Sequence, residues 1–281
     1  MNIYGVIGWP IKHSLSPAMH NAAFKALGID AEYRTFEIKP EGLGDFFADI
    51  DSCIKGLNVT IPHKEKVLDF IQLDQESFYL RQIKAVNTLV RQGKAWKGFN
   101  TDINGFSRHL KVLGFDPRGK KIAILGAGGA SRAVSYELAN KGAQEICIFD
   151  IDKDKASGVA SMLKELFSNL PVKIANSVEE LNILSKDALI NATPIGLKES
   201  DPCLIDKKMI RKDLFVYDLI YNPAETKLLS LAKAAGASYS NGLGMLLYQG
   251  VLSLSKWTGR DNIPIQVVEV MRKALNAAIK Q

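Results

Sequence analysis

Polar side chains that could bind a small polyhydroxylated acid gather in four short segments near the start of the chain. The segments are KHSLSPAMHN (12–21), GLNVTIPHKEKV (56–67), AVNTL (85–89) and GFNTDINGF (98–106). They supply hydroxyls, amides, one amine and one carboxylate, on Ser14, Ser16, Asn58, Thr60, Lys64, Asn87, Thr101 and Asp102. Because residues just beyond the carboxyl ends of parallel strands face the ligand crevice, we expect these side chains to meet there.

Each of these residues also has an ordinary structural role that the sequence leaves open. The two serines could be turn and cap residues, and the two asparagines could satisfy the backbone of a loop. Lys64 could be a solvated lysine, and Asp102 could cap a helix over 103–113. Periodicity does not decide between these interpretations.

A second group of residues could bind a dinucleotide. The run IAILGAGGASRA (122–133) places Gly126, Gly128 and Gly129 directly after a predicted strand and before a predicted helix. Such glycines let the backbone approach a pyrophosphate on the helix N-terminus. Asp150 follows about twenty residues later, where an acid hydrogen-bonds the ribose 2′-hydroxyl of NAD and repels the 2′-phosphate of NADP. Alternatively, this carboxylate caps the next helix.

The elements that must position these residues alternate between strand-like and helix-like patterns, which predicts an α/β fold with largely parallel sheets. In the first part we expect strands at 3–7, 31–38, 56–60 and 86–91. A helix opens at Pro17, with Ser16 as its N-cap. The helix–strand rhythm tightens after the turn-rich stretch 114–121 into that of a doubly wound, nucleotide-binding domain.

The domain organisation follows from these patterns. We expect the first part to form an N-terminal α/β domain and the part after the turn-rich stretch 114–121 to form a Rossmann-like doubly wound domain. Two further helices are predicted at 243–257 and 264–279. The segment 239–281 is expected to return to the first domain and complete it.

Composition narrows the class of protein. The 36 Lys and Arg against 30 Asp and Glu give a net charge of +6 without any basic block, which disfavours a nucleic-acid partner and suits a small anion. The three cysteines form no CxxC motif, and the four histidines show no metal-ligand spacing, so we expect a cytoplasmic protein without a metal. The longest apolar run, 242–254, is too short to span a bilayer, so no membrane association is expected.

The motifs together resemble those of the shikimate dehydrogenase family. The runs HSLSP, NVTIPHK, AVNT, NTD, GAGGASRA, NATPIG, YNP and GMLLYQG occur here in the order found in that family, from about residue 4 to residue 260. The resemblance implies reversible hydride transfer between the C3 hydroxyl of shikimate and a nicotinamide cofactor, giving 3-dehydroshikimate. Members of the family serve aromatic amino acid biosynthesis through chorismate, and some also use quinate.

The resemblance also implies a substrate-binding domain over 1–102, completed by the C-terminal helices of 239–281, and a Rossmann-like NAD(P)-binding domain over 103–238. It implies roles for individual residues as well. Lys64 and Asp102 match the catalytic pair, in which Lys64 would transfer the proton. Substrate binding is implied for Ser14, Ser16, Asn58, Thr60, Asn87, Tyr221 and Gln249. Cofactor binding is implied for Gly126, Ala127, Gly128, Gly129, Ala130, Asp150, Thr193, Gly242 and Met245.

The chain departs from the family pattern at two places. Lys84 stands where the family usually has glycine before AVNT, which adds strain if the backbone there needs a positive φ. NADP-preferring members carry Asn-Arg-Thr where this chain has Asp150, Ile151 and Asp152, with only Lys155 as a basic residue downstream. We therefore expect NAD as the preferred cofactor, with NADP as the alternative.

Other functions remain open at this point. One is an NAD-dependent quinate/shikimate dehydrogenase of catabolism, and another is a methylenetetrahydrofolate-type dehydrogenase. A third is a non-catalytic NAD-sensing protein on the same fold, which would have no need to keep Lys64 and Asp102. The small-molecule partner is shikimate or quinate, and the chain is expected to be a monomer or a homodimer.

Overall fold

The computed structural model describes residues 1–73, 77 and 79–279, and it divides the chain into two compact units. Unit 1 comprises Met1–Gly105 and Leu246–Gln281, and unit 2 comprises Phe106–Met245. Both divisions fall inside helices, α4 (Thr101–Leu113) and α8 (Leu243–Thr258). The predicted boundaries lay a few residues earlier, because a helix that continues through a division carries no turn signal there.

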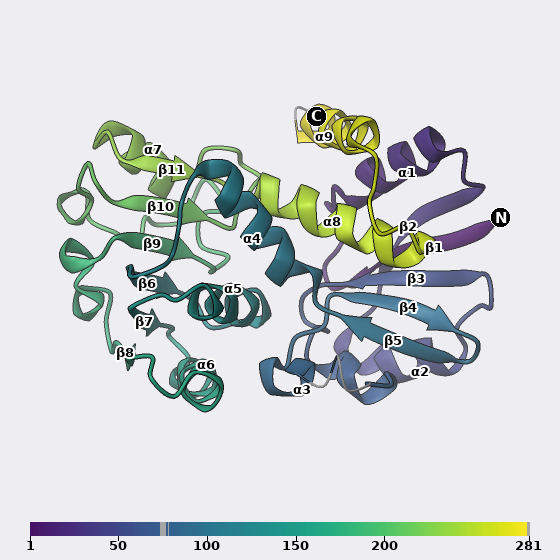
Figure 1. Cartoon of the computed structure of the whole chain (residues 1–281), viewed down its shortest axis with the longest axis horizontal. Helices are drawn as coiled ribbons and strands as arrows, with labels where there is room; N and C mark the ends of the chain where they lie inside the picture. The colour runs from purple at the N-terminus through teal and green to yellow at the C-terminus, as the bar shows by residue number, and fades with distance from the viewer. Residues whose placement is uncertain (74–76, 78, 280–281) are drawn as a thin grey trace. The chain divides into compact units, whose positions relative to one another are not determined.

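Unit 1 is built on a five-stranded sheet with the order β2-β1-β3-β4-β5 (Figure 1). Its strands are β1 (Asn2–Gly8), β2 (Ala31–Glu37), β3 (Ile54–Val59), β4 (Thr88–Gln92) and β5 (Ala95–Phe99). The first three are parallel, whereas β4 is antiparallel to β3 and β5 is antiparallel to β4. The prediction of largely parallel sheets is confirmed, with the β4–β5 hairpin as the antiparallel exception, and β5 was not predicted.

The helices of unit 1 bury one face each against this sheet or against each other. They are α1 (Ser16–Leu27), α2 (Leu43–Ala48), α3 (Tyr79–Ile83) and α9 (Ile265–Ile279), with 3-10 turns η1 (Pro40–Gly42) and η2 (Lys66–Phe70). Leu15, not Ser16, occupies the N-cap of α1, and Ser16 is the first helical residue. The predicted cap at Ser16 is wrong because the turn before the helix is already helical at Leu15.

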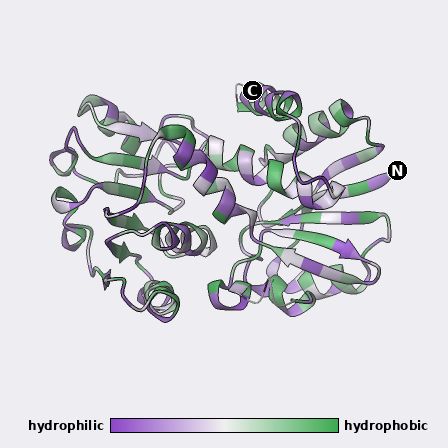
Figure 2. Ribbon diagram, in the orientation of Figure 1, coloured by the Kyte–Doolittle hydropathy of each residue, from purple (hydrophilic) through white to green (hydrophobic). Residues whose placement is uncertain are grey.

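Unit 2 holds a six-stranded sheet with the order β11-β10-β9-β6-β7-β8, in which every recorded pair is parallel. The strands are β6 (Lys121–Leu125), β7 (Glu145–Phe149), β8 (Val172–Ile174), β9 (Ala188–Asn191), β10 (Phe215–Asp218) and β11 (Ser238–Ser240). The interior strands are mostly hydrophobic along their length, as expected for a sheet covered on both faces (Figure 2). The order confirms the predicted doubly wound, Rossmann-like fold.

The helices of unit 2 follow the strands in the doubly wound pattern. They are α5 (Gly129–Asn140), α6 (Lys153–Leu166) and α7 (Lys227–Ala234), with 3-10 turns η3 (Glu179–Leu181), η4 (Ile183–Ser185) and η5 (Lys207–Met209). The strand order reverses between β6 and β9, and ligands of such sheets bind beyond the carboxyl ends of the strands at that point. Within the described residues, no helix is both long and apolar enough to cross a membrane.

Candidate active site

Three strands of unit 1 place their polar ends at one edge of the sheet. Asn58, near the end of β3, lies opposite Thr88, the first residue of β4, and Thr88 lies opposite Phe99, the last residue of β5. Since β4 runs antiparallel between its neighbours, its beginning shares an edge with their ends. The polar segments therefore meet as predicted, although the direction of β4 was not.

Lys64 and Asp102 form an ion pair at this edge, with 2.5 Å between the lysine Nζ and Asp102 Oδ2. Their side chains are only 13% and 8% exposed. The carbonyl of Lys64 accepts a hydrogen bond from the N–H of Val86 (2.8 Å), which fixes the lysine beside the AVNTL segment. Asn100, not Asp102, caps α4, since Asn100 Oδ1 accepts from the N–H of Ile103 (3.2 Å). The carboxylate of Asp102 is thus free of capping and faces the amine.

Asn87 orients the carboxylate of this pair. Its amide nitrogen donates to Asp102 Oδ1 (2.8 Å) and to the hydroxyl of Thr101 (3.0 Å). Its amide oxygen accepts from the backbone N–H of Thr101 (2.7 Å). Both amide hydrogens are therefore occupied within the protein, and Asn87 holds Asp102 at the same time as it stands in the predicted substrate site.

Asn58 connects the site to α1 through Tyr33. Its Oδ1 accepts from the phenol of Tyr33 (2.8 Å), and its amide nitrogen donates to the carbonyl of Asn87 (3.1 Å). The backbone of Tyr33 is in turn hydrogen-bonded to the side chain of Asn21 on α1. Burial raises the pKa of Tyr33 well above its usual range, so the phenol keeps its proton.

The remaining predicted substrate residues of unit 1 are Ser14, Thr60 and Gln249. The hydroxyl of Ser14 accepts from the N–H of Ser16 (3.3 Å), and Thr60 is the half-buried residue that follows β3. Gln249 projects from α8, and its Oε1 lies 3.3 Å from the amide nitrogen of Asn87. A Cβ at Gly105 would lie 2.7 Å from the backbone nitrogen of Gln249, so this glycine lets α8 approach closely.

Two buried hydroxyls beside these residues were not identified from the sequence. Thr88 and Ser253 have no exposed surface, and both touch the amide of Asn58. Thr88 belongs to the AVNTL run, so its position gave a signal. Ser253 lies in an apolar stretch of α8, and a serine on the buried face of such a helix was the only sign of it.

The glycine turn of unit 2 connects β6 to α5. Gly126 has a φ of 95°, and a Cβ there would lie 2.9 Å from the carbonyl group of Ala192, so only glycine fits. Gly128 caps α5, and a Cβ there would meet nothing within 4 Å. Ser131, at the usual third glycine position, donates to the carbonyl of Gly126 (2.6 Å) and stabilises the turn. Gly129 and Ala130 open the helix behind it.

Asp150 ties this turn to the loop after β7. Its Oδ2 accepts from the N–H of Ala127 (2.6 Å), and its Oδ1 accepts from the N–H of Asp152 (2.8 Å). Asp152, not Asp150, caps α6, which removes the alternative interpretation of Asp150 as a helix cap. Lys155 Nζ lies 3.2 Å from Asp152 Oδ2, and Ile151 is 93% exposed. The one basic residue at the downstream position is therefore paired with a carboxylate.

Thr193 is fixed by a buried network behind the loop after β9. Its hydroxyl donates to Asn191 Oδ1 (2.7 Å), and Asn191 Nδ2 donates to Asp218 Oδ1 (3.0 Å). The hydroxyl of Thr226 donates to Asp218 Oδ2 (2.7 Å). Asp218 has no exposed surface, and desolvation raises its pKa. The hydrogen bonds from Thr226 and Asn191 oppose this shift, because they stabilise the carboxylate.

The last predicted residues, Tyr221, Gly242 and Met245, also belong to unit 2. A Cβ at Gly242 would lie 2.0 Å from the carbonyl oxygen of Leu219, so the start of α8 needs a glycine before it. The N–H of Gly242 donates to the carbonyl of Ile220 (3.2 Å), directly before Tyr221. Met245 lies in the first turn of α8. This hydrogen bond joins the segment that leads into Tyr221 to the start of α8.

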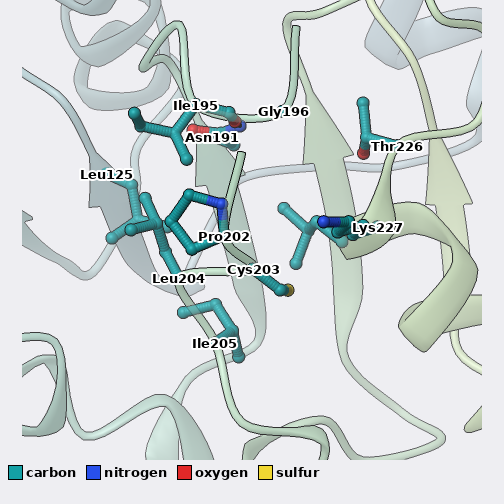
Figure 3. A pocket seen from close by; sticks show the side chains of 11 residues that line it. Leu125, Asn191, Ile195, Gly196, Pro202, Cys203, Leu204, Ile205, Thr226 and Lys227 are labelled. Atoms are coloured by element: carbon teal, nitrogen blue, oxygen red, sulfur yellow. The ribbon is translucent and has the colours of Figure 1, made fainter. Parts of the chain in front are cut away.

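A small pocket lies beneath the loop after β9 (Figure 3). It is lined by Leu125, Asn191, Ile195, Gly196, Pro202, Cys203, Leu204, Ile205, Thr226, Lys227 and Leu228. None of the predicted site residues lines it, so we assign it no ligand. Among the described residues, no group of three or more His, Cys, Asp or Glu side chains is arranged to hold a metal ion.

Comparisons with known families agree with this geometry. Residues 6–89 match the model of the shikimate dehydrogenase substrate binding domain, and residues 242–275 match that of the shikimate 5′-dehydrogenase C-terminal domain. The shikimate dehydrogenase (NADP(+)) of Methanopyrus kandleri is 46% identical over 98% of this chain and 94% of its own length.

Solved structures give the same result. Shikimate 5-dehydrogenase of Thermus thermophilus, in complex with NADP(H) and shikimate, has a TM-score of 0.85 at 30% identity and covers 99% of this chain and 100% of its own. Shikimate 5-dehydrogenase of Listeria monocytogenes, in complex with shikimate and NAD, has a TM-score of 0.83 at 34% identity, with coverage of 96% and 95%. These similarities support a nicotinamide cofactor, but the name of the Methanopyrus relative does not support the predicted preference for NAD.

Proposed function

The chain belongs to the shikimate dehydrogenase family, and we propose that it catalyses reversible hydride transfer between C3 of shikimate and a nicotinamide cofactor, giving 3-dehydroshikimate. The observation that supports this most is the close Lys64–Asp102 pair, set among hydroxyls and amides at one edge of the unit 1 sheet. In this proposal unit 1 binds the substrate and unit 2 binds the cofactor.

The chemistry follows from the pair. The nicotinamide, when bound, accepts or supplies the hydride. A neutral lysine amine takes the proton of the C3 hydroxyl during oxidation, and an ammonium returns it during reduction. Asp102, held by Asn87, keeps the lysine nitrogen in place for both directions. A positioned acid–base group of this kind contributes about 10²–10⁴ in rate.

The rest of unit 1 supplies recognition of a small polyhydroxylated acid. In this proposal Ser14 and Ser16, at the start of α1, hold the carboxylate through their hydroxyls. Asn58, Thr60 and Gln249 hydrogen-bond the ring hydroxyls, which is supported by the contact of Gln249 with Asn87 and the half-buried position of Thr60.

Replacing Lys64 with alanine tests the catalytic role. Turnover of shikimate should fall by at least about 10²-fold, whereas substrate affinity should change little, because the lost amine acts mainly in proton transfer in the transition state. Lys66→Ala is the matched control, since its side chain is 68% exposed and pairs with Asp69. Unchanged turnover in Lys64→Ala would overturn the assignment.

We further propose that Asp150 makes NAD the preferred cofactor. Asp150 places a carboxylate at the glycine turn, and Asp152 follows two residues later. A backbone N–H from Lys155 lowers the pKa of Asp152, so this acid stays ionised. A 2′-phosphate near them would be repelled, whereas a ribose hydroxyl can donate to a remaining lone pair of Asp150. This proposal runs against the NADP(+) in the name of the Methanopyrus relative, so it needs a direct measurement.

That measurement is the ratio of kcat/KM with NAD to kcat/KM with NADP. We expect a ratio above one for the unmodified enzyme and a shift toward NADP in the double variant Asp150→Asn, Ile151→Arg. Asp154→Asn removes an exposed acid from the same turn and should leave the ratio unchanged. A parent enzyme that already prefers NADP would refute the role of Asp150.

The same assay separates the other functions. Efficient oxidation of quinate alongside shikimate would indicate the catabolic quinate/shikimate type, and no cofactor reduction with either substrate would indicate a sensing protein. The buried Lys64–Asp102 pair favours the catalytic alternatives. Sedimentation analysis would distinguish the proposed monomer from the proposed homodimer.

A further inference from the structure

Three buried hydroxyls form a compact group behind the predicted substrate residues. The hydroxyls of Thr88 and Ser253 lie 2.8 Å apart, and each lies 3.1 Å from the hydroxyl of Thr101. We call this group the hydroxyl triad. Its side chains are 0%, 0% and 3% exposed in the order Thr88, Ser253, Thr101, so solvent does not compete for their hydrogen bonds.

We propose that the hydroxyl triad positions the amides of Asn58 and Asn87 and thereby sets which ring hydroxyls the substrate site accepts. The members of the triad are positioning residues, because they act through the two asparagines. This inference rests on the proposed function and extends it to substrate selectivity.

The orientation of the Asn87 amide is fixed by neighbouring groups that can act only as a donor or only as an acceptor. The backbone N–H of Thr101 can only donate, so the atom 2.7 Å from it is the amide oxygen of Asn87. The Asp102 carboxylate accepts from the amide nitrogen on the other side. The hydroxyl of Thr88 donates to the Asn87 oxygen (3.1 Å), which adds a third constraint from the triad.

The Asn58 amide is fixed in the same way. The carbonyl of Asn87 can only accept, so the atom 3.1 Å from it is the Asn58 amide nitrogen. That nitrogen also lies 3.1 Å from the hydroxyl of Thr88 and 3.0 Å from that of Ser253. Two amide hydrogens thus face three acceptors, and none remains for a ligand.

The consequence is a defined polarity for the site. Among the described residues, the Asn58 oxygen receives one hydrogen bond, from Tyr33, and keeps a second lone pair. At this position the substrate must therefore offer a hydroxyl hydrogen, and a group that can only accept is rejected. The hydroxyl of Ser253 donates to the carbonyl of Gln249 (3.0 Å), which also links the triad to the substrate residue on α8.

A pair of substitutions at Thr88 separates the hydroxyl from its shape. Thr88→Val keeps the volume and removes the hydroxyl, whereas Thr88→Ser keeps the hydroxyl and removes a methyl group. Ser253→Ala removes a second member of the triad. Ser255→Ala, on the same helix, removes a hydroxyl that donates to the carbonyl of Arg260, away from the triad, and serves as the matched control.

KM and kcat are measured with shikimate and with analogues that each lack one ring hydroxyl. Thr88→Val and Ser253→Ala should raise the KM for shikimate about tenfold, the value of one lost hydrogen bond, with kcat changed far less. The KM for the analogue that lacks the hydroxyl bound by Asn58 should stay near its parent value. Thr88→Ser should restore most of the shikimate KM, and Ser255→Ala should match the parent.

The outcomes are distinct. Equal changes for shikimate and every analogue, or equal effects of valine and serine at Thr88, would show a merely structural role and overturn the proposal. A parent that does not oxidise shikimate would refute the proposed function instead. In that case hydrogen exchange of the Asn58 side-chain amide decides the positioning: the inference requires slow exchange in the parent, at least about tenfold faster exchange in Thr88→Val, and no change in Ser255→Ala.

Discussion

A buried histidine makes the stability of unit 1 sensitive to acid. His20, on α1, has no exposed surface, and neither ring nitrogen has a hydrogen-bond partner within the described residues. Its ring stacks on Tyr33 at 4.5 Å and lies 5.0 Å from the ring of Trp257. Burial lowers the pKa of His20 from 6.5 to about 3, because the surroundings offer nothing to stabilise an imidazolium.

The size of the effect follows from proton linkage. The unfolded chain binds a proton at this histidine near pH 6.5, whereas the folded unit does not until about pH 3. Stability is therefore fully present above pH 6.5 and falls as the pH drops toward 3. Each unit of pH in this window costs about 1.4 kcal/mol, so His20 removes about 2 kcal/mol of unfolding free energy between about pH 8 and about pH 5.

The substitution His20→Leu removes the titrating group and keeps an apolar side chain of similar size. Between about pH 8 and about pH 5, we expect the unfolding free energy of the variant to fall by about 2 kcal/mol less than that of the parent. At about pH 8 the unfolding free energies of the parent and the variant should differ by only about 1 kcal/mol. The variant loses the ring stacking, and the removal of two unsatisfied nitrogens offsets part of this loss.

The assay is urea unfolding followed by tryptophan fluorescence. All three tryptophans, Trp9, Trp96 and Trp257, belong to unit 1, so their fluorescence reports this unit alone. His13→Gln, at an exposed histidine, is the control and should keep the pH dependence of the parent. If His20→Leu loses as much stability as the parent between the two pH values, the reasoning about the buried imidazole is wrong.

Three further predictions concern backbone strain and buried polar groups. Lys84 is exposed with a φ of 52°, so Lys84→Gly should stabilise unit 1 by about 1 kcal/mol in the same urea assay, and Lys84→Ala should not. Gly126→Ala should destabilise unit 2 by about 3 kcal/mol in thermal unfolding. Gly128→Ala should leave the fold intact, because a Cβ there would meet nothing in the protein within 4 Å. It should raise the KM for the cofactor about tenfold, since the cofactor would meet this Cβ. Thr226→Val should cost about 3 kcal/mol, measured by hydrogen exchange of α7, by removing both a helix cap and a donor to Asp218, and Thr226→Ser should not.

Much of the fold was predictable from periodicity and turn residues, and the β4–β5 hairpin shows where this failed. The connection between Gln92 and Ala95 has only two residues, and Gly93 adopts a φ of 64°. A glycine in a two-residue loop between strand-like runs is a hairpin signal. It was overlooked because the helix–strand alternation elsewhere favoured parallel strands.

For the candidate site, the types and positions of the residues were predictable, but their partners were not. Ser253 touches Asn58 across 195 positions of sequence, a contact that no local pattern could indicate. Lys84 lies between these cases, because its departure from the family pattern raised the question of a positive φ, and only the backbone could answer it.

Asp150 shows why a residue's predicted function and its structural role must be considered together. Its two oxygens accept from the N–H groups of Ala127 and Asp152, so the carboxylate that we propose to select NAD also holds the glycine turn in place. An asparagine offers only one oxygen, and one of these N–H groups would lose its acceptor. Asp150→Asn should therefore weaken the binding of both cofactors through the turn, and only the change in their ratio reports the charge. If a variant binds both cofactors more weakly but keeps the ratio of kcat/KM with NAD to kcat/KM with NADP, its glycine turn is disrupted and its cofactor selectivity is unchanged.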